Sequence, residues 1–264
     1  MLADYHTHTP LCGHATGAPV EYALAAMAMG LAEVGISDHS PMLETFDNWR
    51  MKFADLDEYL SLVAEARSAV APFPVRLGLE VDYIRGHEKW IETLANRAPW
   101  DFLIGSVHYI APGWDVDNPK WIGCFDDRPV EEIWSLYFAE YEKCIRSGLF
   151  DFVAHPDLPK KFGHRPSGDL RRFYEPVITA LAETGTVMEV STAGLRKPVE
   201  EIYPSRQMLE MAFAAGVEIV VSSDAHSREE VGADFPAAEK LVREVGYIST
   251  VQFARRKKRR VSLS

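Results

Sequence analysis

The sequence predicts an α/β protein whose parallel strands form a closed barrel covered by helices. Short apolar runs rich in β-branched residues alternate with longer stretches whose apolar residues recur at helical spacing. Such alternation is typical of a parallel sheet covered by helices. The seven apolar runs are residues 1–6, 33–39, 75–81, 101–109, 151–156, 186–192 and 217–226. Because no linker interrupts them, we expect one domain over residues 1–264 rather than two.

The stretches between the apolar runs carry the signals of helices. Pro19 suits the first turn of a helix, where its missing N–H costs nothing. Gly148 and Gly216 suit helix ends, because glycine readily adopts the left-handed conformation found there. The helices expected from these signals and from apolar spacing are residues 19–32, 56–70, 131–148 and 205–216.

Composition places the chain among ordinary globular proteins. Hydrophobic residues make up 47% of its 264 residues and charged residues 25%. The net charge of −11 argues against nucleic-acid binding, which usually needs a basic face. Three separated cysteines fit a reducing compartment without disulfides. No run approaches the ~20 apolar residues of a membrane helix, and the first residues lack a signal-peptide pattern. We therefore expect a cytoplasmic protein that binds neither nucleic acid nor membrane.

Most histidines occupy one position in this pattern, the end of an apolar run. Seven of the nine histidines lie at such ends or just after them, and two carboxylates share the position. In parallel α/β barrels the active site forms at the carboxyl ends of the strands, so these side chains should converge on one rim. The set comprises His6, His8, His14, His39, Glu80, His108, His155, Asp224 and His226.

A metal site explains this convergence better than structural histidines do. A single histidine at a strand end is more often structural, and an H-x-H pair alone is a weak motif. Residues two apart on a strand face the same side, so His6 with His8, or Asp224 with His226, could bind one ion. Imidazole and carboxylate suit zinc, iron or manganese. Nine candidates exceed the three or four ligands of one catalytic zinc, which suggests two or three ions.

The motifs around these residues resemble the PHP (polymerase and histidinol phosphatase) family. The similar motifs are the H-x-H start, "SDHS" at 37–40, the lone Glu80, "GSVHYI" at 105–110, "AHPDL" at 154–158 and "SSDAH" at 222–226. The resemblance extends from residue 4 to about residue 245. Residues 105–119, 152–163 and 191–205 resemble the histidinol-phosphatase branch of that family.

This resemblance implies a distorted (β/α)7 barrel, with a trinuclear metal centre at the carboxyl ends of the strands. It implies hydrolysis of L-histidinol phosphate to L-histidinol and phosphate in histidine biosynthesis, by a hydroxide that bridges two ions. The cofactors would be three divalent transition-metal ions: zinc, iron or manganese. The ligand sets it implies are His6, His8, Glu80 and Asp224 for the first ion, His14, His39 and His226 for the second, and His108 and His155 with bridging Glu80 for the third.

Arg196 is the expected phosphate clamp, and it joins Glu80 and Asp224 in the predicted catalytic set. A guanidinium fork matches a phosphate better than an ammonium does. Gly194, two residues earlier, would let the backbone approach the ligand. The alternative is a surface arginine that begins a loop. Lys160, Lys161 and Arg165 form a second basic group after the fifth run. One side chain, Lys161 or Arg165, could reach the phosphate, but most of the group is expected to be solvated.

The loop after the fourth run is expected to recognise the leaving group, which carries an ammonium and an imidazole. Its residues Trp114, Asp115 and Asp117 offer an aromatic wall and two carboxylates. We expect Asp117 to pair with the ammonium and Trp114 to contact the ring. The alternative is a polar loop with Asp as a turn former. Asp38 stays outside the catalytic set, because on an extended strand it would point away from the rim.

Two other functions remain open at this stage. The same metal ligands would serve a PHP-type nucleotide phosphatase or exonuclease, although the chain shows no groove of interleaved basic and aromatic residues. The second is a metal-binding regulator without catalysis. Such a protein would be expected to lack some of the metal ligands, whereas the set in this sequence is complete. The basic segment at 255–261 is interpreted as a solvated end or a basic edge strand.

Overall fold

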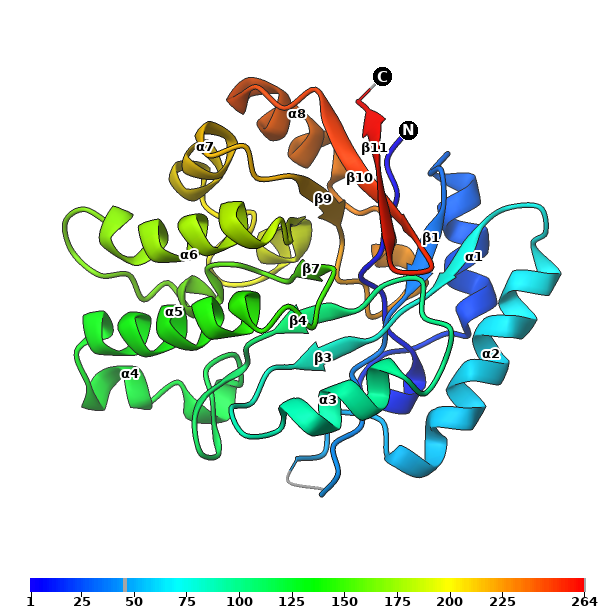
Figure 1. The fold of residues 1–264 in the computed structure, drawn as a ribbon, viewed down its shortest axis with the longest axis horizontal. Coiled ribbons are helices and arrows are strands. Elements are labelled where there is room, and N and C mark those ends of the chain that lie inside the picture. The colour runs from blue at the N-terminus through cyan, green and yellow to red at the C-terminus, as the bar shows by residue number, and fades with distance from the viewer. Residues whose placement is uncertain (45–46, 264) are drawn as a thin grey trace.

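The computed structural model describes residues 1–44 and 47–263, and it has an α/β fold with parallel strands at its centre (Figure 1). Among the described residues, the largest sheet has five strands, all parallel. In spatial order they are β3 (Glu80–Asp82), β4 (Ile104–Ser106), β7 (Phe152–Val153), β8 (Val187–Ser191) and β9 (Ile219–Ser222). The predicted α/β class and the parallel sheet are confirmed.

Two further segments continue this parallel arrangement. Strand β1 (Val34–Ile36) pairs in parallel with β2 (Val75–Leu77), and a single bridge joins His39 to Glu80 at the start of β3. Single parallel bridges also join Asp4 to Val34 and Thr7 to Ala225. The N-terminal segment therefore lies between β1 and the segment that follows β9.

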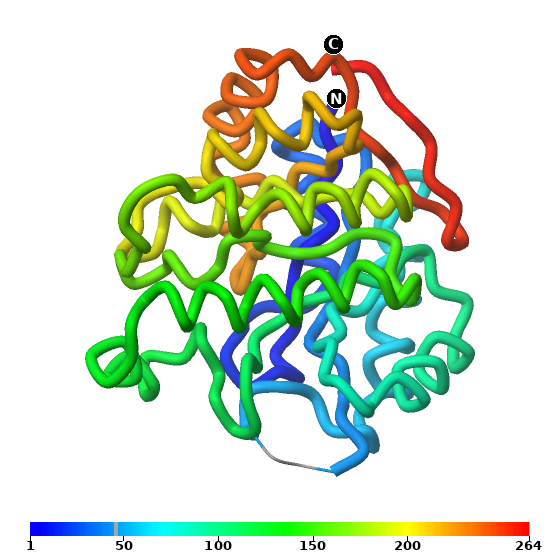
Figure 2. The backbone as a smooth tube through the Cα atoms, turned by 60° about the vertical axis from the view of Figure 1, so that its left-hand side comes forward, coloured from blue at the N-terminus to red at the C-terminus, as the bar shows by residue number. Residues whose placement is uncertain are grey.

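Helices surround the strands in both views (Figures 1 and 2). They are α1 (Pro19–Ala28), α2 (Leu56–Ala69), α3 (Glu88–Ala95), α4 (Cys124–Asp127), α5 (Val130–Arg146), α6 (Arg171–Thr184), α7 (Arg206–Ala214) and α8 (Phe235–Val245). The predicted end signals are confirmed: Pro19 is the first residue of α1, and Gly148 and Gly216 lie just beyond α5 and α7 with φ of 67° and 74°. No described helix is long and apolar enough to cross a membrane.

The regular strands are shorter than the apolar runs that predicted them. Within the run at 101–109, only β4 belongs to the main sheet. The last residue of the run, Tyr109, begins β5 (Tyr109–Ala111), which pairs antiparallel with β6 (Trp114–Asp115). The run at 151–156 gives the two-residue β7. The backbone leaves the sheet near the candidate ligands, where His155 and Asp224 have positive φ values of 29° and 53°. A repeating extended conformation cannot include such residues.

A second apolar cluster lies among the strands, apart from the main core beneath the helices. It comprises Ala3, Tyr5, Phe102, Ile104, Phe152, Ala154, Val187, Val220, Val251 and Phe253. Gly35 and Gly78 leave room for Phe102, because a Cβ at either position would lie 2.5 Å or less from its ring. Val251 and Phe253 come from β10 (Ser249–Ala254), which thereby adds to this cluster.

The basic segment near the C-terminus forms a strand, as one of its two interpretations expected. Strand β11 (Lys257–Ser262) pairs antiparallel with β10. Its side chains from Lys257 to Arg260 are exposed. Lys258 and Arg260 pair with Glu218 at 2.7 and 2.8 Å, so part of this positive charge is neutralised within the chain.

Phe253→Ala should lower the free energy of unfolding by about 3–5 kcal/mol, because it leaves a cavity among packed aromatic rings. Phe253 contacts Tyr5, Phe102 and Phe152 with ring centroids 5.6, 6.3 and 5.5 Å away. Ile248→Ala is the control, since Ile248 is 80% exposed. Urea unfolding measures the free energy of unfolding of both variants. A loss in Phe253→Ala no larger than that in Ile248→Ala would show that β10 contributes nothing to the inner cluster through this side chain.

Candidate metal centre

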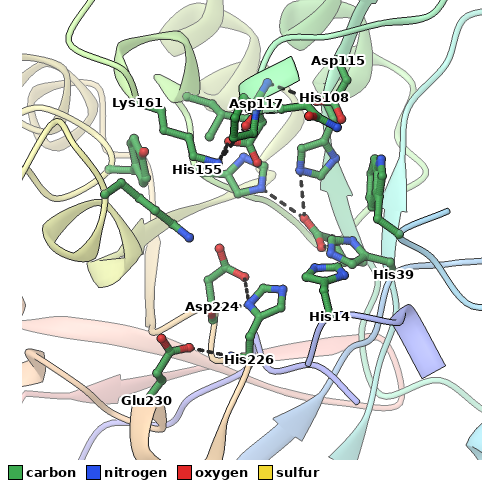
Figure 3. A pocket seen from close by; sticks show the side chains of 17 residues that line it. His14, His39, His108, Asp115, Asp117, His155, Lys161, Asp224, His226 and Glu230 are labelled. Carbon is green, nitrogen blue, oxygen red and sulfur yellow. Dashed lines mark hydrogen bonds and ion pairs between the residues drawn. The ribbon is translucent and has the colours of Figure 1, made fainter. Parts of the chain in front are cut away.

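All nine predicted metal ligands meet at one end of the parallel strands. Most of them line a cavity of about 410 Å³. Figure 3 shows His108 and His155 pointing into this cavity from one side and His14, His39 and His226 from the other. His6 and His8 lie beneath it and are fully buried. The predicted convergence of segments more than 200 positions apart is therefore observed in the geometry.

Glu80 is the carboxylate at the centre of the cluster. Its Oε2 lies 2.7 Å from His39 Nδ1 and 3.2 Å from His6 Nε2, and its Oε1 lies 3.1 Å from His155 Nε2. His108 Nε2 is 3.8 Å from the same Oε1. Burial alone raises the pKa of Glu80, but His39 and His6 outweigh burial and hold that pKa well below its ordinary value. The carboxylate is therefore ionised.

Asp224 is the second carboxylate of the cluster. Its Oδ1 lies 3.0 Å from His8 Nε2, 3.5 Å from His6 Nε2 and 3.7 Å from His226 Nδ1. The left-handed backbone of Asp224 turns the chain immediately after β9. Strained backbone of this kind is concentrated at functional sites, where surrounding contacts hold it.

Compact groups of possible ligand atoms match much of the predicted division. Within each group, one ligand atom per residue lies within 4.8 Å of the others. Three of these groups are His6, His8 and Glu80; Glu80, His108 and His155; and His8, His39 and His226. His14 is in none of them, but its ring lies 4.6 Å from that of His226 and 5.3 Å from that of His39.

Several ligand atoms are buried without a hydrogen-bond partner among the described residues. They include His6 Nε2, His39 Nδ1 and Glu80 Oε2, which lie close together but do not meet hydrogen-bond geometry. A buried polar atom left without a partner costs about 1–3 kcal/mol. Burial lowers the pKa of His39 to about 4, despite the opposing effect of Glu80, so its ring is neutral. Imidazole nitrogens and carboxylate oxygens are donors that zinc, iron and manganese accept, so this donor set fits divalent cations.

A second layer of carboxylates holds the histidines from behind. Glu189 Oε1 lies 2.7 Å from His6 Nδ1, and Asp82 Oδ1 lies 2.7 Å from His108 Nδ1. Such partners fix the orientation of a ligating imidazole. Sequence reasoning missed both. Two signals could have found them. Asp82 follows Glu80 by two residues and so shares its strand face, and Glu189 is the charged residue inside the apolar run 186–192.

Asp38 belongs to the same layer. It is fully buried, and its Oδ1 lies 3.4 Å from His8 Nδ1 and accepts a hydrogen bond from the backbone N–H of His39 at 2.8 Å. Its place outside the predicted catalytic set agrees with this position. Asp38 also forms a compact group with His8 and Cys12, but the Cys12 thiol donates to the carbonyl of Thr9 at 3.0 Å.

The structure separates the residues predicted to bind substrate. Asp117 and Lys161 line the cavity but form an ion pair with each other, and Lys161 also donates to the Asp117 carbonyl at 2.8 Å. Trp114 and Arg165 are not among the described residues that line the cavity. Trp114 packs beneath the guanidinium of Arg128, and Arg165 pairs with Glu201. The substrate-binding roles of Trp114 and Arg165 stay predictions.

Arg196 is also absent from the described residues that line the cavity. Its guanidinium donates to the carbonyl of Ser223 at 2.6 Å and lies 3.4 Å from Glu230 Oε1. Glu230 in turn accepts from the backbone N–H of His226 at 2.8 Å. Arg196 thus contacts the loop that carries Asp224 and His226, while its Nη1 is buried without a hydrogen-bond partner among the described residues. Its role as a phosphate clamp stays a prediction.

Gly194 lies where two segments pack closely. A Cβ at this position would lie 1.9 Å from the carbonyl oxygen of Glu201 and 3.0 Å from Tyr203 Cε2. Glycine is therefore needed because η5 (Thr192–Arg196) packs closely against the following loop.

Several cavity residues were not anticipated, among them Trp49, Lys197 and Tyr203. The Trp49 ring meets His39 edge-on at 4.8 Å and His108 at 5.2 Å. It supplies the aromatic wall that was expected from Trp114. Trp49 lies outside every motif, and Lys197 and Tyr203 lie within the 191–205 segment without having been singled out there. Each reaches the cavity from a loop whose path depends on the rest of the fold.

Comparison with known proteins agrees with this geometry. The model of the PHP domain matches residues 4–193. The chain belongs to the PHP family. It is 42% identical to a probable histidinol-phosphatase of Deinococcus radiodurans over 258 residues, which cover 97% of this chain and 98% of that protein. It is 28% identical to the histidinol-phosphatase of Bacillus subtilis, over 89% of this chain and 97% of that one.

A solved structure shares this fold. The histidinol phosphate phosphatase of Lactococcus lactis, crystallised with zinc, L-histidinol and phosphate, superposes with a TM-score of 0.81. The match covers 98% of both chains at 20% sequence identity. At that identity the likeness establishes the fold alone.

Glu80→Gln should reduce the metal bound by purified protein at least as severely as Glu189→Gln. The first change removes the charge at the centre of the cluster, whereas the second removes a partner behind His6, a loss that costs about 10–100-fold in metal affinity. Metal analysis after dialysis against graded chelator measures both. Glu92→Gln, at an exposed position, is the control. Wild-type metal content in Glu80→Gln would place the ions elsewhere.

Proposed function

We propose that this chain is a histidinol-phosphatase: a metal-dependent phosphomonoesterase that hydrolyses L-histidinol phosphate to L-histidinol and phosphate in histidine biosynthesis. The observation that carries this proposal is the cluster of seven histidines with Glu80 and Asp224 at one cavity. The relative that is 42% identical over nearly the full length of both chains supports the substrate. The net charge of −11 remains unfavourable for a nucleic-acid substrate.

The finer architecture is part of the same proposal. The strands form one distorted (β/α)7 barrel in a single domain over residues 1–264. The isolated bridges Asp4–Val34, Thr7–Ala225 and His39–Glu80 support this, because they connect the N-terminal segment and β1 to the two edges of the five-stranded sheet.

Three divalent ions would be held by the nine clustered side chains. His6, His8, Glu80 and Asp224 hold the first, His14, His39 and His226 the second, and His108, His155 and Glu80 the third. Bound divalent ions neutralise phosphoryl oxygens and lower the pKa of water toward ~7. The chain's own part is to fix these ligands, and the carboxylates Glu189, Asp82 and Asp38 do so from behind.

Lysines supply the positive charge on the wall above the metal ligands. Lys161 and Lys197 both line the cavity. Lys161 is anchored by Asp117, which leaves Lys197 as the better candidate to reach a phosphoryl oxygen. Arg196 then acts indirectly, by holding Ser223 and Glu230 beside Asp224 and His226.

Asp115 is the best candidate to pair with the substrate ammonium. It lines the cavity and is buried, and its Oδ1 accepts a hydrogen bond from the backbone N–H of Asp117 at 3.1 Å. Burial raises the pKa of Asp115 to about 6, against the opposing effect of His108. A substrate ammonium beside Asp115 would lower this pKa again and keep the carboxylate ionised. Asp117, the residue favoured by sequence, is already paired with Lys161.

Removal of metal should abolish phosphate release from L-histidinol phosphate, and added zinc, iron(II) or manganese should restore it. The reason is that both charge neutralisation and water activation depend on the ions. Phosphate release measures the activity, and circular dichroism checks that the stripped protein stays folded. A preference for a 3′,5′-bisphosphonucleotide or a short oligonucleotide over L-histidinol phosphate would instead support the nucleotide phosphatase or exonuclease.

Asp115→Asn should lower kcat/KM for L-histidinol phosphate about 10–100-fold, since a hydrogen bond to a charged group contributes about 1.5–3 kcal/mol. An uncharged aryl phosphate lacks the ammonium, so its hydrolysis should change little. Asp117→Asn is the matched control: it frees Lys161 and should affect both substrates alike. Equal losses on both substrates in Asp115→Asn would contradict the proposed pairing.

A further inference from the structure

Tyr203 carries a buried hydroxyl that nothing in the described structure satisfies. The residue is 1% exposed, and its phenol oxygen has no hydrogen-bond partner among the described residues. Tyr203 nevertheless lines the cavity above the metal ligands. Other buried tyrosine hydroxyls do find partners: Tyr137 donates to the His155 carbonyl at 3.0 Å, and Tyr174 lies 3.2 Å from Ser205 Oγ.

The backbone of Tyr203 is fixed by the neighbouring strand. Its N–H donates to the Ser191 carbonyl at 3.0 Å, and its carbonyl accepts from the Ser191 N–H at 2.7 Å. Ser191 is the last residue of β8, so the sheet sets the height of Tyr203 along the cavity. Gly194 allows the turn after β8 to pass the edge of the ring.

A fully buried lysine holds the ring from the other side. Lys160 Nζ lies 5.1 Å from the Tyr203 ring centroid and donates to the Ile202 carbonyl at 2.7 Å. The same ammonium pairs with Asp157 at 3.0 Å and Glu201 at 3.1 Å. Lys160 and Asp157 follow His155 in the chain, so this ion-pair cluster joins the loop of a metal ligand to the loop of Tyr203. The hydroxyl is therefore held in place rather than free to seek another partner.

The surroundings of the hydroxyl favour donation to a bound anion. Burial, and then the carboxylates of Asp117, Asp157 and Asp224, raise the pKa of Tyr203 well above its ordinary value, so it stays protonated. Asp117 and Asp224 also line the cavity. A phosphoryl oxygen held between the metal ligands and this wall offers the acceptor that the described residues do not supply.

We propose that the Tyr203 hydroxyl donates a hydrogen bond to a phosphoryl oxygen of the phosphate monoester. The choice of ester rests on the proposed function, whereas the contact with a phosphoryl oxygen requires only that the cavity binds phosphate. Tyr203 is thus a substrate-binding residue, and Lys160 and Gly194 position it.

Titration of zinc-loaded protein with inorganic phosphate tests the contact by calorimetry. Tyr203→Phe keeps the ring and removes the donor, so the dissociation constant for phosphate should rise about tenfold or more, the scale of a hydrogen bond to a charged group. Tyr174→Phe is the matched control, because its buried hydroxyl bonds to Ser205 on the same loop and Tyr174 is not among the described lining residues. Its phosphate affinity should equal that of wild type, and all three proteins should bind the same amount of zinc.

Unchanged phosphate affinity in Tyr203→Phe would overturn the inference. A loss of zinc from Tyr203→Phe would overturn it as well, because the hydroxyl would then support the metal ligands instead. Wild-type protein that binds phosphate but does not hydrolyse L-histidinol phosphate would refute the proposed function and leave the Tyr203 contact to be decided by the same titration.

Discussion

The buried carboxylate of Glu80 is the constraint on which the rest of the site depends. Its side chain is 1% exposed, and burying an ionised group is costly unless other groups pair with it or donate to it. His6, His39 and His155 approach it within 3.2 Å from three separate segments. The three segments must therefore bring these histidines to the same edge of the sheet, and parallel strands do so because their carboxyl ends lie together. A metal-binding role accounts for why so many donors are directed at one carboxylate.

The strand ends show how this arrangement is maintained. His155 has a positive φ, a conformation disfavoured for a residue with a side chain. Its N–H donates to Glu189 at 2.6 Å, and its carbonyl accepts from Tyr137 at 3.0 Å. Glu189 also contacts His6. One buried carboxylate thus supports two candidate ligands, and the surrounding hydrogen bonds hold a backbone geometry that the sheet alone would not produce.

The wall above the ligands is built differently. Ion pairs between Lys161 and Asp117, and between Lys160 and Asp157, fix loops rather than strands. A residue within such a pair is less available to a substrate than its sequence motif suggests. Asp115 is therefore a better candidate than Asp117 to bind the substrate ammonium, because Asp117 is already paired with Lys161. For the same reason, the hydroxyl of Tyr203, which has no partner among the described residues, is available to a bound substrate.

The sequence by itself determined the α/β class, the parallel sheet and all nine clustered ligand candidates, from His6 to His226. The class and the sheet follow from the spacing of apolar residues along the chain. The ligand candidates follow from their position at the ends of the apolar runs, because parallel strands bring their carboxyl ends together whatever their separation in the chain. Tertiary structure decided which side chains form the wall. Arg196 donates to the Ser223 carbonyl, Trp114 lies beneath Arg128, and Trp49 and Tyr203 reach the cavity instead. Loop residues have no fixed period, so their direction depends on contacts with distant segments.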